Sequence, residues 1–461
     1  MRALYDSKSK TMNYFGIKEL MSKEAKYQVW LDIEAALAKA QSEFGIIPKK
    51  AAENIGKAAK IEYMDFKLMD EIYKKIGHGF VPFIKVFIKA CDKISGENES
   101  SKYIHYGVTT QNIQQSGQLI ILKQLHEKYL LICSKILENL AKLAEDNKNS
   151  VMAGRTHGKH AIPITYGYKV SVWISDILTS IERMEEVEKR IFKIMMGGAV
   201  GAFNTAGEIG RKIQNRVAEI LEMYSMEVPS RNITSHKEEY IMIMALLANN
   251  CHKIAEEVYS TSIEEYGEVS EAYEAGTIGS STMPQKINPK LAKGIIANSQ
   301  KLYSIVPMGL YSGSRPFEAD SSSYMLFDAA LEETMELTTE ILLRTEELTR
   351  TVQVFKDRMY QNTLNNKGLD NSEYIMMKIA EKLGKDKAHS IIYKLAIKSE
   401  TEHKDYLQLL KEDELLSSIF DENDIKNLLK PENYIGLSSQ LAIEMAEKAR
   451  KKAVKIKKYK V

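Results

Sequence analysis

Gly279-Ser280-Ser281-Thr282-Met283-Pro284-Gln285-Lys286-Ile287-Asn288-Pro289 is a run of small, polar and turn-forming residues between two long helical patterns. Its two prolines lie five positions apart. A proline lacks the N–H that a helix needs and moves the residue before it away from the helical conformation. The run is therefore predicted to be a loop held between two helices. It contains adjacent serine hydroxyls, an ammonium and a carboxamide, and loops placed by a rigid scaffold often carry binding and catalytic residues.

Proline is rare in the rest of the chain. Only nine prolines occur among 461 residues, and the intervals around 82–163, 163–229 and 316–431 leave room for very long helices. Few segments alternate β-branched and polar residues as a strand would. The fold class is therefore predicted to be all-α.

The length of the chain exceeds what one compact core usually holds, so several domains are expected. We predict three helical domains: residues 1–108, a central long-helix bundle over 109–362 that carries the Gly279–Pro289 loop, and a small C-terminal domain over 363–461. The bundle is indicated by apolar residues that recur at spacings of three and four: Leu119, Leu122, Leu125, Tyr129, Ile132, Ile136, Leu140 and Leu143.

Several helix boundaries follow from the local sequence. Ser22 is predicted to open a helix that ends near Gly45. Pro163 is predicted to open a helix from Ile164 to about Met196, and another helix is expected over 238–274. After the loop we expect a helix over 291–303, a second loop over 307–323 and a helix over 325–356.

The composition of the chain argues against several classes of partner and site. Lys and Arg number 64 and Asp and Glu number 62, so neither nucleic acid nor an anionic membrane is the expected partner. No apolar run is long enough to cross a bilayer. The chain has three widely spaced cysteines, which predicts reduced, buried thiols in a cytoplasmic protein. We predict neither a metal site nor a cofactor.

The Gly279–Pro289 loop contains residue types suited to removing a proton beside a carboxylate. Ser280 is the candidate base, because a nearby ammonium such as Lys286 and backbone N–H groups of the Gly279–Ser281 turn would favour its ionised form. Lys286 and Asn288 are natural donors to a carboxylate that gains charge during the reaction. Taken alone, this motif would favour a turn-capping role for Ser280.

Two histidines lie in glycine-flanked loops. His157 follows Arg155-Thr156 and precedes Gly158, and it is the candidate acid because histidine exchanges a proton near neutral pH. His78 lies between Gly77 and Gly79. A histidine in a turn often has only a structural role.

Five motifs in this chain resemble those of the fumarase/aspartase superfamily, on the branch of the adenylosuccinate lyases and 3-carboxymuconate cycloisomerases. The Gly279–Pro289 loop resembles the superfamily signature throughout. His105–Asn112 resembles the HxGxTSxD element with Thr110 and Asn112 in place of Ser and Asp, and 155–158 resembles the RTHG element. Gly198–Gly201 matches the GAVG turn, and 433–436 resembles the C-terminal YLG element.

The resemblance implies a reaction and a set of roles. It implies an elimination that releases fumarate, with Ser280 taking the proton and His157 protonating the leaving group. Further residues are implied to bind a small dicarboxylate substrate: His78, Thr109, Thr110, Gln111, Thr156, Lys286, Asn288 and Arg315. It also implies a homotetramer with a central helix bundle and active sites shared between subunits, without a cofactor.

The chain departs from adenylosuccinate lyases where they bind a nucleotide phosphate. Ala319 and His236 stand where arginines are expected, and no basic residue follows Ala319 until Arg344. These departures predict a substrate other than adenylosuccinate, although Arg315 lies close to position 319. The main hypothesis is a carbon–nitrogen lyase. The alternatives are a 3-carboxy-cis,cis-muconate cycloisomerase, which the presence of His157 disfavours, and a non-catalytic superfamily member.

Overall fold

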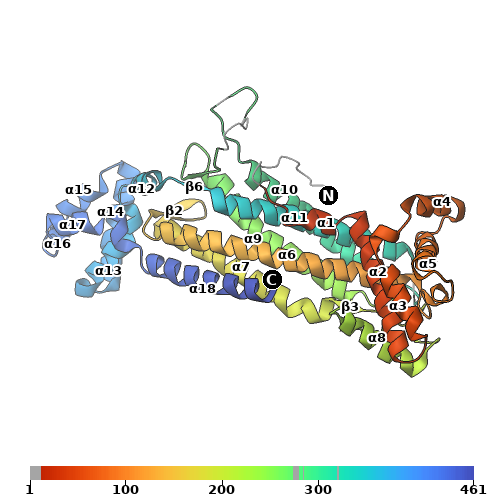
Figure 1. Cartoon of the computed structure of the whole chain (residues 1–461). Coiled ribbons are helices and arrows are strands. Elements are labelled where there is room, and N and C mark those ends of the chain that lie inside the picture. Colours follow the sequence, from red (N-terminus) through yellow and green to blue (C-terminus); the bar gives the residue numbers. More distant parts are fainter. Residues whose placement is uncertain (1–11, 274–279, 284, 319–320, 461) are drawn as a thin grey trace.

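A bundle of long helices forms the middle of the molecule (Figure 1). The computed structural model describes residues 12–273, 280–283, 285–318 and 321–460. Helices α6 and α7 lie against each other, α10 packs on α9 and α11, and α18 returns along α6 and α7. Their bounds are α6 Thr110–Asp146, α7 Tyr166–Ile191, α9 Ser235–Thr261, α10 Lys290–Gly313, α11 Ser321–Thr351 and α18 Ser438–Lys460.

The N-terminal helices cover one end of this bundle (Figure 1). Ser22 begins α2 by accepting a hydrogen bond from the N–H of Ala25 at 3.1 Å, as the sequence predicted. Helix α2 contacts α3, α6 and α8. The bounds are α1 Ile17–Leu20, α2 Lys23–Glu43, α3 Lys49–Ala58, α4 Phe66–Ile76, α5 Val81–Ser95 and α8 Gly207–Ile220, with 3-10 turns η1 Ile61–Tyr63 and η2 Ser101–Tyr103.

Short helices gather at the other end (Figure 1). They have a core of their own, in which Ile379, Ala388 and Tyr406 are fully buried. The alanines of α18 instead belong to the large core of the bundle. The bounds are α12 Lys356–Leu364, α13 Ser372–Leu383, α14 Lys385–Glu402, α15 Tyr406–Glu412, α16 Glu414–Ser417 and α17 Glu422–Leu428, with 3-10 turns η3 Leu369–Asn371 and η4 Pro431–Tyr434.

Three two-stranded pairings join the helices in the described part of the chain. The largest is an antiparallel hairpin of β1 (Val151–Thr156) and β2 (Lys159–Thr165), with an irregularity between Ala153 and Arg155. Gly154 lies at this irregularity, where a Cβ atom would be 2.5 Å from the carbonyl oxygen of Ile162. The other pairings are parallel β3 (Lys193–Ile194) with β4 (Tyr224–Ser225) and antiparallel β5 (Val269–Ser270) with β6 (Gln353–Val354).

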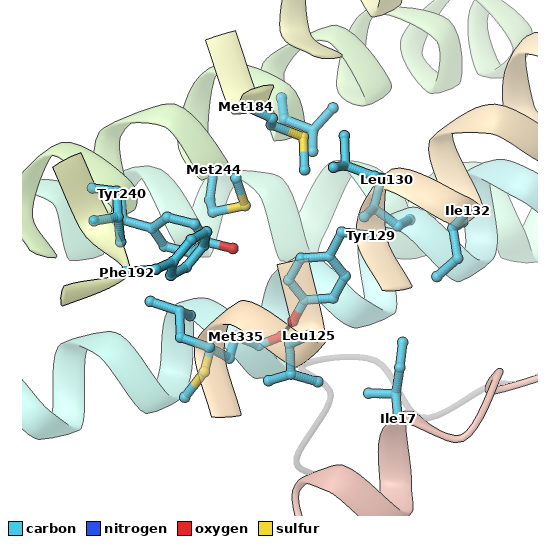
Figure 2. Packing of buried hydrophobic residues seen from close by; sticks show 14 of the residues in the cluster. Ile17, Leu125, Tyr129, Leu130, Ile132, Met184, Phe192, Tyr240, Met244 and Met335 are labelled. Carbon is cyan, nitrogen blue, oxygen red and sulfur yellow. Dashed lines mark hydrogen bonds between the residues drawn. The ribbon is translucent and has the colours of Figure 1, made fainter. Parts of the chain in front are cut away.

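The bundle core combines aliphatic and aromatic side chains, and some of its buried hydroxyl groups are hydrogen-bonded (Figure 2). Tyr129 of α6 is fully buried, and its hydroxyl donates to the carbonyl of Met335 at 2.9 Å and lies 3.0 Å from the hydroxyl of Thr339. The rings of Phe192 and Tyr240 lie 6.3 Å apart at a steep angle. The first contacts join α6 to α11, and the ring pair joins the end of α7 to α9.

The all-α prediction is confirmed, but several boundaries are wrong. Pro163 lies in β2 and not at a helix start, so α7 begins only at Tyr166, with Thr165 as its cap. Helix α9 ends at Thr261, because the chain then turns at Gly267 and pairs through β5. Pro307 lies inside α10, where packing against α9 and α11 outweighs the backbone hydrogen bond that proline cannot donate.

The three cysteines of the chain are free and buried, as predicted. The division into three domains at residues 108 and 362 stays a prediction. No helix in the described ranges combines the length and the apolar character that a membrane crossing requires.

Candidate active site

The described part of the loop presents the hydroxyl of Ser280 to backbone donors. Ser280 is half-buried, and its Oγ accepts the N–H of Met283 at 3.1 Å and the N–H of Thr282 at 3.4 Å. Hydrogen bonds to the charged form of a group favour that form, so this turn is suited to a serine that must lose its proton. The expected donors were the N–H groups of the Gly279–Ser281 turn, whereas the observed donors belong to Thr282 and Met283. Gly279 itself lies outside the described residues.

Lys286 and Asn288 follow in the same loop. Lys286 is exposed, its N–H donates to the carbonyl of Met283 at 3.0 Å, and it forms no ion pair with the described residues. Asn288 is half-buried, one residue before Pro289, the N-cap of α10. Pro284 lies outside the described residues. The loop thus offers an ammonium to solvent close to Ser280 in sequence.

A buried carboxylate anchors the exit of the loop, and sequence reasoning missed it. Glu271 is 6% exposed, and its carboxylate accepts the N–H groups of Leu291 at 3.0 Å and Ala292 at 2.7 Å. It therefore caps α10 from the chain segment that precedes the loop. Burial raises the pKa of Glu271, while the backbone donors of α10 lower it.

His157 lies at the tip of the β1–β2 hairpin. It is exposed and has a positive φ of 54°, followed by Gly158 at 75°. Thr156 is exposed too and pairs with Lys159 across the turn. The hairpin therefore holds the imidazole away from the core of this chain. This position suits a side chain that contributes to a site on a neighbouring molecule.

The base of this hairpin is held by Glu268, which sequence reasoning also missed. The guanidinium of Arg155 donates to both carboxylate oxygens of Glu268, at 3.0 and 2.5 Å, and lies 4.7 Å from the ring centre of Tyr266. Asn362 donates to the same carboxylate at 2.8 Å. Glu268 is fully buried and comes three residues before Glu271.

Thr109, Thr110 and Gln111 lie together at the start of α6. Thr109 is the N-cap, and the side-chain oxygen of Asn112 accepts its N–H at 3.0 Å and the N–H of Gly198 at 3.2 Å. All three predicted residues are half-buried. A helix start offers free N–H groups and a positive dipole end, so this corner is suited to a carboxylate. Asn112 ties it to the glycine-rich turn.

His78 lies at the same end of the bundle. Its Nδ1 accepts the N–H groups of Phe80 and Val81, both at 3.1 Å, which leaves the proton of the neutral ring on the exposed Nε2. The ring of Phe80 lies 5.1 Å from that of His105. His105 in turn bonds the buried carboxylate of Glu34 through its N–H at 2.9 Å and its Nδ1 at 2.7 Å.

Arg315 follows α10 and is accompanied by residues that were not predicted. Its Nη1 donates to the carbonyl of Arg231 at 3.3 Å, and its guanidinium lies 5.5 Å from the ring centre of Tyr324. Lys237 is fully buried and donates to Gln118 Oε1 at 2.9 Å. Burial lowers the pKa of Lys237 to about 8, although nearby Asp328 raises it.

His236 does not replace the expected arginine. It is 6% exposed, and burial, with the adjacent charge of Lys237, lowers its pKa to about 3. The imidazole is therefore neutral near pH 7 and is a poor ligand for a phosphate. Ala319 lies outside the described residues.

The predicted site residues form two groups, which lie far apart within a single chain. The first comprises His78, Thr109–Gln111 and Arg315, and the second comprises Thr156, His157, Ser280, Lys286 and Asn288. Helix α10 separates Asn288 from Arg315 and has 24 residues, which corresponds to about 36 Å. Helix α6 separates Thr110 from the hairpin and has 37 residues, or about 55 Å. Figure 1 shows the hairpin and the start of α6 at different ends of the bundle.

No group of three potential metal ligands lies together in the ranges that the structure describes. The described site residues are suited to proton transfer and to carboxylate binding. A serine with backbone donors, an exposed histidine and a helix start suit acid–base chemistry on an anionic substrate.

Comparisons with known proteins find relatives along most of the chain. Residues 8–301 match the family model described as Lyase, and residues 368–444 match the model described as Adenylosuccinate lyase C-terminus. The adenylosuccinate lyase of Methanocaldococcus jannaschii is 32% identical over 96% of this chain and 94% of its own length. The N-acetyl-S-(2-succino)cysteine lyase of Enterococcus italicus is 30% identical over 93% of both chains.

Among solved structures, the 3-carboxy-cis,cis-muconate lactonizing enzyme of Pseudomonas putida shares the fold. It is 23% identical, with a TM-score of 0.85 over 96% of this chain and 98% of that chain. The matched models span most of the sequence, and they include the five motifs at 105–112, 155–158, 198–201, 279–289 and 433–436. The chain belongs to the fumarase/aspartase superfamily of lyases, near the adenylosuccinate lyases.

Proposed function

We propose that this protein is a lyase that eliminates a nitrogen leaving group from a succinyl-type substrate and releases fumarate. The observation that carries the proposal is the environment of Ser280, whose Oγ accepts two backbone N–H groups in a loop that also holds Lys286. Both relatives named above carry a succinate-type acid in the names of their substrates, which supports the same substrate class.

In the proposed reaction Ser280 removes a proton from the carbon next to a carboxylate. Lys286 and Asn288 stabilise the charge that moves onto that carboxylate, and Thr109 and Thr110 hold the second carboxylate at the start of α6. His157 protonates the nitrogen as its bond to carbon breaks. His78, Gln111, Thr156 and Arg315 are assigned to substrate binding. Each step is a proton transfer or an electrostatic effect, so no cofactor is required.

The proposed enzyme is a homotetramer in the cytoplasm. The two groups of site residues are separated by about 36 Å along α10, which a small dicarboxylate does not span. We therefore propose that each active site takes its parts from several copies of the chain. The exposed position of His157 at the hairpin tip is consistent with a role on a neighbouring copy.

A substrate panel tests the proposal. Purified protein is incubated with adenylosuccinate, other N-succinyl amines and an S-succinyl thiol, and fumarate is followed by its absorbance. We expect fumarate from at least one N-succinyl compound, and a loss of about 100-fold or more in kcat for Ser280→Ala. Normal turnover by that variant would exclude Ser280 as the base. Lactone without fumarate from a carboxymuconate would favour the cycloisomerase alternative, and binding without turnover would favour a non-catalytic member.

A further inference from the structure

Phe317 is a large apolar side chain that the fold holds in solvent. It is 80% exposed, the highest value among the exposed large apolar side chains of the described residues. Its backbone has a positive φ of 60°, which a residue with a bulky side chain seldom adopts. Unusual backbone conformations and exposed apolar groups both concentrate where a protein binds a ligand or partner.

Hydrogen bonds fix the backbone that carries this ring. The side-chain amide of Asn232 donates to the carbonyl of Phe317 at 2.7 Å, so the segment before α9 holds the segment after α10. The N–H of Asn232 donates to the side-chain oxygen of Ser230 at 3.2 Å. The ring is thus exposed although its backbone is anchored. A side chain on an anchored backbone loses less freedom when it binds a ligand.

The segment that carries Asn232 packs closely on the glycine-rich turn. At Gly201 a Cβ atom would lie 2.5 Å from the carbonyl oxygen of Pro229 and 2.7 Å from the Cα atom of Ser230. No side chain fits at this position, so glycine permits the two backbones to meet. Since Ser230 also accepts the N–H of Asn232, the anchor of Phe317 is continuous with this turn.

The glycine-rich turn borders the proposed carboxylate site at the start of α6. The N–H of Gly198 donates to the side-chain oxygen of Asn112 at 3.2 Å, and the same oxygen accepts the N–H of Thr109, the N-cap of α6. A series of direct contacts therefore connects Thr109 with Phe317. The leaving-group half of the substrate extends beyond its carboxylates, and it is the part available to an exposed ring at this corner.

The chemistry of the side chain indicates the group that it would bind. A benzyl side chain carries no charge and donates no hydrogen bond, so it contributes burial and the attraction between flat rings. Tyr311 near the end of α10 and Met325 near the start of α11 are 77% and 72% exposed, so further apolar surface flanks this segment. A flat aromatic group gains both burial and stacking, whereas an aliphatic group gains burial alone.

We propose that Phe317 stacks on a planar aromatic group in the amine half of the substrate and is a specificity-determining residue. This inference rests on the proposed elimination and names the class of its leaving group. The substrate is then a succinyl amine whose amine carries an aromatic ring close to the nitrogen.

Two substrates that differ in the flatness of one ring test the proposal. N-benzylaspartate and N-(cyclohexylmethyl)aspartate have the same carbon skeleton, and elimination from either gives fumarate and the free amine. We expect the ratio of their kcat/KM values, benzyl over cyclohexylmethyl, to be about 3- to 10-fold higher in the wild type than in Phe317→Leu, mainly through KM. The intrinsic reactivity of the two amines is the same for both proteins and cancels in this comparison.

Adenylosuccinate carries a purine on the reacting nitrogen and serves as a third substrate. If it alone is turned over, its KM should rise about 3- to 10-fold in Phe317→Leu. An unchanged KM in that case would overturn the stacking role.

Matched variants separate stacking from other effects. Phe317→Tyr keeps an aromatic ring and should keep the substrate ratio of the wild type. Tyr393→Leu removes an exposed ring from α14, among the short helices at the other end of the bundle, and should also leave the ratio unchanged. Thermal unfolding and sedimentation check the fold and the assembly of each variant.

The outcomes distinguish the two proposals. Fumarate production with the same substrate ratio in the wild type and in Phe317→Leu would overturn the stacking role and leave the elimination standing. If that variant also assembles less well, the ring belongs to a contact between copies of the chain. Absence of fumarate from all three substrates with the wild type would contradict the proposed function instead.

In that last case binding still tests Phe317. Calorimetry measures the affinity of N-benzylaspartate and N-(cyclohexylmethyl)aspartate for the wild type and for Phe317→Leu. We expect the variant to bind the benzyl compound about 3- to 10-fold more weakly and the cyclohexylmethyl compound almost equally. Equal binding of the benzyl compound by both proteins, or none by the wild type, would overturn the stacking role.

Discussion

Arg155 and Glu268 form a two-bond ion pair at the base of the hairpin that carries His157, with N–O distances of 3.0 and 2.5 Å. Glu268 is fully buried, and the side chain of Arg155 is 14% exposed. Since β5 follows directly, the same short segment that holds the hairpin also leads to Glu271 and the Ser280 loop. The geometry of both proposed catalytic elements thus depends on two glutamates three residues apart.

Replacing Glu268 by Gln should destabilise the protein strongly. The substitution leaves a buried guanidinium without its counter-charge, which costs about 3–5 kcal/mol in comparable cases. Chemical unfolding of the variant and the wild type measures the difference. Glu381→Gln, which breaks the exposed pair with Lys378, is the matched control and should change little. Equal stability of the Glu268 variant would show that Asn362 and Tyr266 hold Arg155 without the charge.

Replacing Glu271 by Ala should reduce kcat more than it changes the fold. Without the carboxylate, the N–H groups of Leu291 and Ala292 lose their acceptor, and the start of α10 shifts together with Asn288. A displacement of catalytic groups by about 1 Å can reduce rates by about 100-fold. We expect a fall in kcat on the order of 10- to 100-fold and faster hydrogen exchange at residues 291 and 292. Slow exchange at these amides in the variant would contradict the anchoring role.

Mixing two inactive variants should restore activity. Thr110→Ala removes a group at the start of α6, and Ser280→Ala removes the proposed base on the other side of the bundle. If each site draws on several copies, subunits exchanged between the two proteins will assemble some sites in which both residues are intact. Fumarate release after mild dissociation and reassembly measures the recovery. The separately treated variants are the controls, and failure to recover despite verified exchange would argue for sites within one chain.

The stability difference between the wild type and Lys237→Met should depend on pH. The pKa of Lys237 is about 8 in the folded protein, below its ordinary value, so burial of the ammonium opposes folding below pH 8. As pH rises from 8 to 9 the folded protein releases this proton before the unfolded chain does, and the wild type gains about 1 kcal/mol relative to the variant. Paired unfolding curves at the two pH values measure this change. A difference that stays constant would mean that Asp328 and Gln118 keep the ammonium charged.

The sequence was sufficient for the fold class and for the helix at Ser22, because these depend on local periodicity and capping. It was not sufficient for the β1–β2 hairpin. Pro163 resembles a helix start in sequence but lies on β2, where pairing with Ala153 decides the conformation. Likewise α9 ends at Thr261, since the β5–β6 pairing joins residues more than 80 positions apart.

The candidate site likewise has a part that the sequence predicted and a part that it did not. The residues in motifs were found from the sequence, and His157, Ser280 and Thr109 lie in turns or at helix starts as expected. Their supports were missed, because Glu268 and Glu271 bind groups far along the chain. A carboxylate in a helical pattern gives no local sign of the helix start that it will cap. Whether the motif residues carry the assigned roles stays a prediction.

Helix α18 has a consequence for how the protein is made. Its buried alanines and its Lys457, which pairs with Glu138 319 positions earlier, complete a groove formed by α6 and α7. During synthesis that groove stays uncovered until the ribosome has made the long segment between α7 and α18 and then α18 itself. A newly made apolar surface of this kind is a natural target for chaperones and for misassembly with neighbouring nascent chains. The rate of translation between α7 and α18 is thus a variable in the yield of native protein.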